Sequence, residues 1–235
     1  MSKILIVPDV HGRKFWHKAE ELINEVDKVV FLGDYLDPYE YEGITFENAV
    51  MEFENILAFK EDYPDKVILL LGNHDMHYVR TDFMDCSRLN YAQRQEMHDL
   101  YMNNIGSFQI IYEEENYLFS HAGIYKEWMD KYTLTLDDLR DYRNFLKNWW
   151  KTLEDCSYYR GGWNKVGSCI WADVYESLKN ELYTDKRQIV GHSQLKENPY
   201  ITDTISYLDV RQCFILNTET NEIKSVTEET TEVFS

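Results

Sequence analysis

LLLGNHD, residues 69–75, runs from three leucines directly into glycine, asparagine, histidine and aspartate. A run that is apolar on successive residues is typical of a strand buried on both faces of its sheet. In open α/β sheets, ligands bind just beyond the carboxyl ends of the strands. The stretch therefore predicts a buried strand that delivers Asn73 and His74 to a functional site.

The same pattern occurs four more times along the chain. Short apolar runs end in Asp9 and His11, in Asp34, in His121 and in His192; the sequences are ILIVPDVH (4–11), KVVFLGD (28–34), YLFSHAG (117–123) and RQIVGHS (187–193). Segments of helical period separate several of these runs, at residues 14–26, 46–59 and 89–102. Strands that alternate with helices predict an α/β fold.

Each polar residue has an ordinary explanation when taken alone. Asp and Asn form turns at strand ends, and a single His is more often a hydrogen-bonded structural residue than a ligand. Five strands that all end in such residues predict one shared site. Carboxylate, imidazole and amide ligands without thiolate favour Mn²⁺, with Fe or Zn²⁺ as alternatives. About six ligands exceed what one catalytic ion needs, so the count favours two ions.

Composition limits the classes of function. The 235 residues include 44% apolar side chains, enough for one large α/β domain, and we expect a single domain over residues 1–235. Basic residues number 24 and acidic residues 42, a net charge of −18, which argues against non-specific nucleic-acid binding. Four scattered cysteines and the absence of an apolar leader or membrane-spanning run predict a cytoplasmic protein with reduced thiols.

The motifs DVHG (9–12), GDYLD (33–37), GNHD (72–75), SHAG (120–123) and GHS (191–193) resemble, in order and spacing, those of calcineurin-like metallophosphoesterases. The resemblance implies an α/β/β/α sandwich with mixed sheets flanked by helices. Gln194 stands where many branches have a second histidine, which makes the chain most similar to the phosphoprotein (Ser/Thr) phosphatase branch.

Roles for individual residues follow from the resemblance. Asp9 and His11 would hold the first metal, Asp34 would bridge both, and Asn73, His121 and His192 would hold the second. The implied mechanism is direct in-line attack on a phosphomonoester by a hydroxide that two metals activate. His74 would protonate the leaving group, with Asp37 orienting it and raising its pKa. The alternative for Asp37 is a cap before Pro38.

One departure concerns substrate binding. Related protein phosphatases have an arginine after the second motif, where this chain has Pro38, Tyr39 and Glu40. Arg160 resembles a second phosphate-binding arginine of that branch, and its alternative is a solvated loop residue. Arg13 and His77 have weaker claims, and His17 and His98 are interpreted as surface residues of helices.

The C-terminal half is less constrained. The aromatic-rich segment 125–165, helical over 136–153, contributes to the core and is a candidate lid. Segments TISYLDV, CFILNT and EIKSV predict antiparallel strands with a turn at 218–221, and the tail 227–235 is expected to be solvated.

The resemblance implies a phosphorylated protein or small molecule as substrate, and the oligomeric state is not predicted. Alternative functions are a phosphodiesterase, a dinucleoside polyphosphate hydrolase or, in another class, a non-catalytic scaffold of the same fold.

Overall fold

The computed structural model describes residues 2–226, whose strands form two sheets. The first sheet has the spatial order β11 (Glu222–Ser225), β10 (Phe214–Asn217), β1 (Lys3–Val7), β2 (Lys28–Phe31), β3 (Val67–Leu70) and β4 (Phe108–Gln109). Strands β1 to β4 are parallel, whereas β10 runs antiparallel to β1 and β11 antiparallel to β10. The structure confirms the three predicted N-terminal strands as β1, β2 and β3, and it confirms the predicted antiparallel pairing of β10 with β11.

The second sheet has the order β5 (Ile111–Glu114), β6 (Tyr117–Ser120), β7 (Arg187–Val190), β9 (Ile205–Tyr207) and β8 (Tyr200–Ile201). Strands β6, β7 and β9 are parallel, and β5 and β8 are antiparallel edges. The strand predicted at TISYLDV forms as β9 and is antiparallel to β8, but it is parallel to β7 and lies in a different sheet from β10 and β11. Its carboxyl end thus reaches the same edge of the sheet as those of β6 and β7.

The two sheets pack face to face through alternate residues of their strands. Ile4 and Ile6 of β1 face the second sheet and share a buried cluster with Phe119 and Ile189. Leu5 and Val7 point the other way, into the cluster beneath the helices. Both faces of β1 are therefore buried, which explains why its sequence is apolar without alternation. The predicted α/β/β/α sandwich is confirmed.

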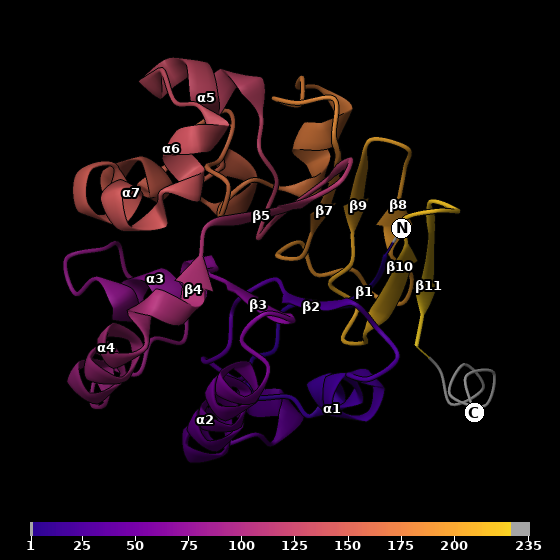
Figure 1. The fold of residues 1–235 in the computed structure, drawn as a ribbon. Coiled ribbons are helices and arrows are strands. Elements are labelled where there is room, and N and C mark those ends of the chain that lie inside the picture. The colour runs from indigo at the N-terminus through magenta and orange to yellow at the C-terminus, as the bar shows by residue number, and fades with distance from the viewer. Residues whose placement is uncertain (1, 227–235) are drawn as a thin grey trace.

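Helices cover the outer faces (Figure 1). In Figure 1, α1 and α2 lie below β1 to β3, while α5 to α7 gather on the opposite side of the molecule. The α-helices are α1 (Lys18–Leu22), α2 (Phe46–Asp62), α3 (Asn73–Val79), α4 (Arg94–Asn103), α5 (Lys126–Tyr132), α6 (Leu136–Arg140) and α7 (Tyr142–Asn148). Helix α2 begins where expected, because the Thr45 hydroxyl accepts a hydrogen bond from the Asn48 N–H at 3.1 Å.

Two predicted helices are shorter than expected. The segment 14–26 forms a 3₁₀ turn at Phe15–His17 and then α1, because the chain must turn before β2 begins; the Glu25 N–H closes that turn on the Leu22 carbonyl at 2.8 Å. The segment 136–153 breaks at Asp141, whose carboxylate accepts from the Asn144 N–H at 3.2 Å and starts α7.

Aromatic side chains of the segment 125–165 divide between core and surface. Tyr125, Trp128 and Phe145 are buried, as expected for core residues, whereas Trp149 and Trp163 are exposed. A role as a lid stays a prediction. All four cysteines are free and buried. None of the helices among residues 2–226 has the length and apolarity needed to cross a membrane. The tail 227–235 lies outside the described residues.

Candidate active site

The carboxyl ends of strands from both sheets meet at one buried centre. Asp9, Asp34 and Asn73 follow β1, β2 and β3, and His121 and His192 follow β6 and β7. Each of these five side chains is buried. Across the two sheets, Asp9 Oδ1 accepts from the His192 N–H at 2.9 Å, and Asn73 Oδ1 lies 3.0 Å from His121 Nε2. The structure thus brings together residues up to 183 positions apart in the sequence.

Asp34 occupies the middle of this centre. Its Oδ1 accepts from the His74 N–H at 2.9 Å, and its Oδ2 lies 3.6 Å from His11 Nε2 and 3.5 Å from His121 Nε2. Two groups of potential metal ligands share Asp34: Asp9 with His11 and Asp34, and Asp34 with His121 and His192. Within each group the ligand atoms lie within 4.8 Å of one another. This is the arrangement that a bridging carboxylate needs.

Backbone carbonyls set the tautomers of two histidines. His11 Nδ1 lies 2.7 Å from the Leu36 carbonyl oxygen, and His121 Nδ1 lies 2.8 Å from that of Leu32. A carbonyl can only accept, so Nδ1 carries the proton and the Nε2 lone pair of the neutral ring faces Asp34. Lone pairs that face a carboxylate repel each other unless a cation lies between them. The donor set therefore fits divalent metal ions.

Burial reinforces this conclusion. Desolvation, and then the neighbouring His74, lower the pKa of His11, while desolvation and then Arg160 lower the pKa of His192. Both rings are consequently neutral and able to ligate. His192 Nε2 is buried without a hydrogen-bond partner. Desolvation, followed by repulsion from Asp209, raises the pKa of Asp9, so the buried carboxylate favours a nearby positive charge.

The backbone is strained where it carries these side chains. His11, Asp34 and His192 have φ values of 45°, 54° and 59°, in the left-handed region that non-glycine residues rarely adopt. Glycines leave the space that the centre needs: a Cβ at Gly72 would collide with Asp34 Oδ1, and one at Gly191 with Asp9 Oδ1. Strained residues and closely approaching glycines around the same centre indicate a functional site.

His74 and Asp37 form the expected pair. His74 Nδ1 lies 2.7 Å from Asp37 Oδ2, and the same oxygen is 2.8 Å from His77 Nε2. The Tyr78 hydroxyl donates to Asp37 Oδ1 at 2.6 Å. Burial raises the pKa of Asp37, but the hydrogen bonds from both histidines outweigh burial and lower it overall. Asp37 is thus an anion held by three donors.

Asp37 raises the pKa of His74, as expected, but burial decides the overall direction. Burial lowers the pKa to about 4, and the hydrogen bond to Asp37 offsets only part of that effect. Burial disfavours the charged His74 ring by more than the Asp37 carboxylate favours it. The nearby Arg88 and His77 lower the pKa of His74 further.

Three residues with weak or no sequence signal join the centre. Arg88 Nη2 lies 3.3 Å from His74 Nε2, and its Nε donates to the Asp37 carbonyl at 2.9 Å. Asp209 follows β9, and burial raises its pKa to about 6 despite the nearby Arg13. His77 is more closely involved than expected, through Asp37. Only Asp209 has a recognisable signal, since it ends a strand-like run as the other acidic residues do.

Arg160 lies at the rim of the centre, half-buried. Its Nη2 donates to the His192 carbonyl at 2.9 Å and to Ser193 Oγ at 3.0 Å, and its Nε lies 2.7 Å from Asp173 Oδ2. It is therefore a fixed residue rather than a solvated loop arginine. The other weaker candidates are structural: Arg13 pairs with Glu42 at 2.7 Å, His17 contacts Glu20 and Glu52, and His98 Nδ1 lies 2.9 Å from the Tyr78 carbonyl.

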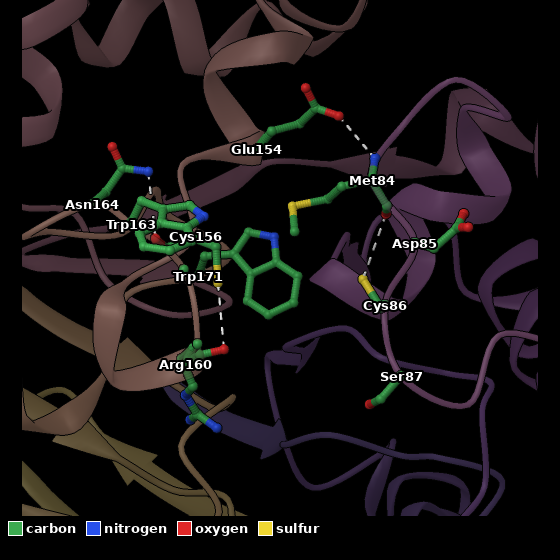
Figure 2. Close-up of a pocket in the computed structure, with 12 residues that line it drawn as sticks. Met84, Asp85, Cys86, Ser87, Glu154, Cys156, Arg160, Trp163, Asn164 and Trp171 are labelled. Atoms are coloured by element: carbon green, nitrogen blue, oxygen red, sulfur yellow. Dashed lines mark hydrogen bonds between the residues drawn. The ribbon is translucent and has the colours of Figure 1, made fainter.

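A cavity of about 360 Å³ adjoins Arg160. Figure 2 shows Met84 to Ser87 on one side of it and Cys156, Trp163 and Asn164 on the other, with the Trp171 indole between them. The Trp171 ring packs edge-on against His192, with 5.7 Å between centroids. The cavity therefore opens on the His192 side of the centre.

Comparisons with known proteins agree with this geometry. Residues 2–209 match the family model of calcineurin-like phosphoesterases. A cold-active protein-tyrosine phosphatase from a psychrophilic Shewanella species is similar in structure, with a TM-score of 0.62 and 16% identity over 97% of this chain and 81% of that one. A protein serine/threonine phosphatase from Saccharomyces cerevisiae, similar to human phosphatase PP5, gives a TM-score of 0.56 and 13% identity over 96% and 80%.

Proposed function

Because the chain belongs to the calcineurin-like phosphoesterase family, we propose that this phosphatase cleaves phosphomonoesters by direct in-line displacement at phosphorus with two divalent metal ions bound. The observation that carries the proposal is the convergence on Asp34 of ligand groups from both sheets. The structural similarity of this chain to protein phosphatases supports a place for it in the phosphoprotein phosphatase branch. The substrate is a phosphorylated protein or small molecule in the cytoplasm.

The metal-binding roles follow the two groups. Asp9 and His11 would hold one ion, Asn73, His121 and His192 would hold the other, and Asp34 would be shared between them. The oxygen and nitrogen ligands without thiolate favour Mn²⁺, with Fe or Zn²⁺ as alternatives. When bound, such ions lower the pKa of a water molecule toward neutrality and stabilise the charge that develops on phosphoryl oxygens.

His74 is the proton donor for the departing oxygen. Its Nδ1–H is directed at Asp37, which leaves Nε2 facing the centre beside Arg88. The phosphate dianion of a substrate at this position favours the imidazolium, which counteracts the loss of charge that burial causes. Asp37 orients the ring and is itself held by Tyr78 and His77.

Two arginines bind the substrate phosphate. Arg88 replaces the arginine that the sequence lacks after Asp37: it comes from a different loop, yet it contacts both the Asp37 carbonyl and His74. Arg160, fixed by Asp173, stands on the His192 side. Guanidinium groups suit this task because they are planar, always charged and able to donate two parallel hydrogen bonds to phosphate.

The test is hydrolysis of a generic aryl phosphate with added Mn²⁺, using wild type, Asp34→Asn and His74→Asn. Asp34→Asn should lose metal and activity together, because it removes the shared ligand. His74→Asn should keep its metal content and lose about 10²- to 10⁴-fold in kcat, the usual contribution of a general acid. Absence of metal-dependent turnover in wild type would instead identify a scaffold, and faster cleavage of diesters or dinucleoside polyphosphates would redefine the substrate class.

A further inference from the structure

A second cavity, of about 680 Å³, is lined in part by Arg88, the arginine that contacts His74. Three segments line it, at residues 38–41, 44–46 and 88–91. Arg88 connects it to the active site, because the guanidinium lies over the Tyr39 ring at 3.8 Å and contacts His74 Nε2 at 3.3 Å. Pro38 directly follows Asp37, the partner of His74.

The cavity carries exposed aromatic rings that are nonetheless fixed in place. Tyr41 is 71% exposed, yet its hydroxyl accepts from Arg211 Nη2 at 2.7 Å and its ring lies 5.3 Å from that of Tyr39. Tyr91 is 68% exposed and donates to Asp85 Oδ2 at 2.8 Å. Each ring therefore offers exposed aromatic surface at the cavity, with one hydrogen bond restraining its hydroxyl.

The position of the proton donor decides which part of a substrate this cavity faces. A general acid must lie within hydrogen-bond reach of the oxygen that it protonates, which is the oxygen joining phosphorus to the leaving group. His74 Nε2 lies beside Arg88, which lines this cavity, whereas the first cavity is lined by Trp171, whose ring packs against His192. The leaving group therefore extends toward the tyrosines.

We propose that the cavity lined by Tyr39, Tyr41 and Tyr91 binds the leaving group of the substrate and favours an aromatic one. This inference rests on the proposed phosphatase function. Offset and edge-on contacts between aromatic rings are worth about 0.5–1.5 kcal/mol beyond the area they bury. A volume of about 680 Å³ accommodates one aromatic group with its linker. Two sources share this chemistry: a tyrosyl side chain and a nucleobase.

The experiment compares 2-phenylethyl phosphate with n-butyl phosphate, since both release simple alkanols and differ mainly in the ring. Wild type, Tyr41→Ala, Tyr91→Ala and Tyr91→Phe are assayed with Mn²⁺, and Trp163→Ala is the matched control. Trp163 is 98% exposed but lines the other cavity. Each alanine variant at a tyrosine should lose about 3- to 10-fold in kcat/KM for the aromatic substrate only, as expected for one ring contact. Tyr91→Phe and Trp163→Ala should match wild type.

Three results would overturn the assignment. Equal losses for both phosphates, or no loss for either, would show that the tyrosines do not recognise the ring, and a selective loss in Trp163→Ala would move the leaving group to the other cavity. In those cases wild type still hydrolyses phosphoesters, so the proposed function stands. If wild type hydrolyses neither phosphate, the function and this inference both fail. Repeating the assay with a phosphotyrosine peptide and a nucleoside 5′-monophosphate identifies the source, as the one whose kcat/KM depends on Tyr91.

Discussion

Cys86 holds Asn73 by two contacts: its thiol donates to the Asn73 carbonyl oxygen at 3.1 Å, and the Asn73 Nδ2 faces the sulfur at 3.8 Å. With the amide nitrogen directed at sulfur, Oδ1 of Asn73 is the atom that points to His121, 3.0 Å from Nε2. The thiol thus orients a metal ligand without touching the metal. Burial raises the pKa of Cys86 well above its ordinary value, so it stays a neutral thiol.

Cys86→Ala should weaken metal binding without abolishing it. Loss of an outer-shell partner typically costs about 10- to 100-fold in metal affinity. Isothermal titration with Mn²⁺ measures the change in affinity. Cys213→Ala, a buried cysteine that contacts Phe15 instead, is the control. Unchanged affinity in Cys86→Ala would show that the Asn73 amide needs no such partner.

Asp37→Asn should reduce kcat about 10- to 100-fold, a part of what a general acid contributes. The neutral amide loses the charge that holds both histidines at one oxygen, and its NH₂ group replaces the oxygen that accepts from Tyr78, so His74 is held less firmly. Tyr78→Phe removes only the hydroxyl bond to Asp37 and should cost far less. Steady-state kinetics on both variants, with metal content measured in parallel, makes the comparison. Similar kcat values for the two variants would contradict a positioning role for the Asp37 charge.

Gly191→Ala should displace the Asp9 carboxylate, because the added Cβ collides with Oδ1. We expect a loss of bound metal that exceeds the loss of stability. Gly106→Ala is the matched control, since the nearest atom to its added Cβ is the flexible end of Arg143 at 3.3 Å. Metal analysis and thermal unfolding separate the two effects, and full metal content in Gly191→Ala would contradict the tight fit at Asp9.

Metal removal should destabilise the fold. A ligand that binds only the folded state raises the free energy of unfolding by RT ln(1 + [L]/Kd), which is about 2.7 kcal/mol when the ligand concentration is 100 times Kd. For a chain of this length that corresponds to a rise in Tm of roughly 5–10 °C. Thermal unfolding after chelation, with and without added Mn²⁺, measures it. Asp34→Asn should show little response, and an equal response there would mean that the metal binds elsewhere.

Stability near neutral pH should depend on Glu176. This buried carboxyl caps the Val174–Leu178 turn, and burial raises its pKa to about 7. The pKa of Glu176 is higher in the folded protein than in the unfolded chain. Its contribution to the free energy of unfolding is therefore fully present below about pH 4.5. It is lost as pH rises through about 7, by on the order of 3 kcal/mol.

The Glu176→Gln side chain cannot ionise, so the variant should not lose this stability as the pH rises. The Tm of the variant minus that of wild type should therefore increase between pH 5 and pH 8. Differential scanning calorimetry across this range checks the slope. Glu25→Gln, at an exposed position, should give a constant difference. A constant difference for Glu176→Gln as well would mean that the carboxyl is charged throughout.

The sequence by itself determined the buried strands and the polar residues that end them. Burial of β1 on both faces requires apolar side chains on successive residues, so Ile4 to Val7 could be recognised without coordinates. Five repeats of a polar residue after such a run were enough to predict one site. The family motifs assigned expected roles to those residues.

Only the tertiary structure decided what lies beside that site. Arg88 has no local signal, because a loop arginine that contacts His74 and one that faces water have the same sequence pattern. The parallel pairing of β9, and with it the position of Asp209, depends on contacts with β7 that are distant in sequence. Likewise, the pKa of His74 depends on how completely the fold excludes water, a property of packing in three dimensions rather than of neighbouring residues.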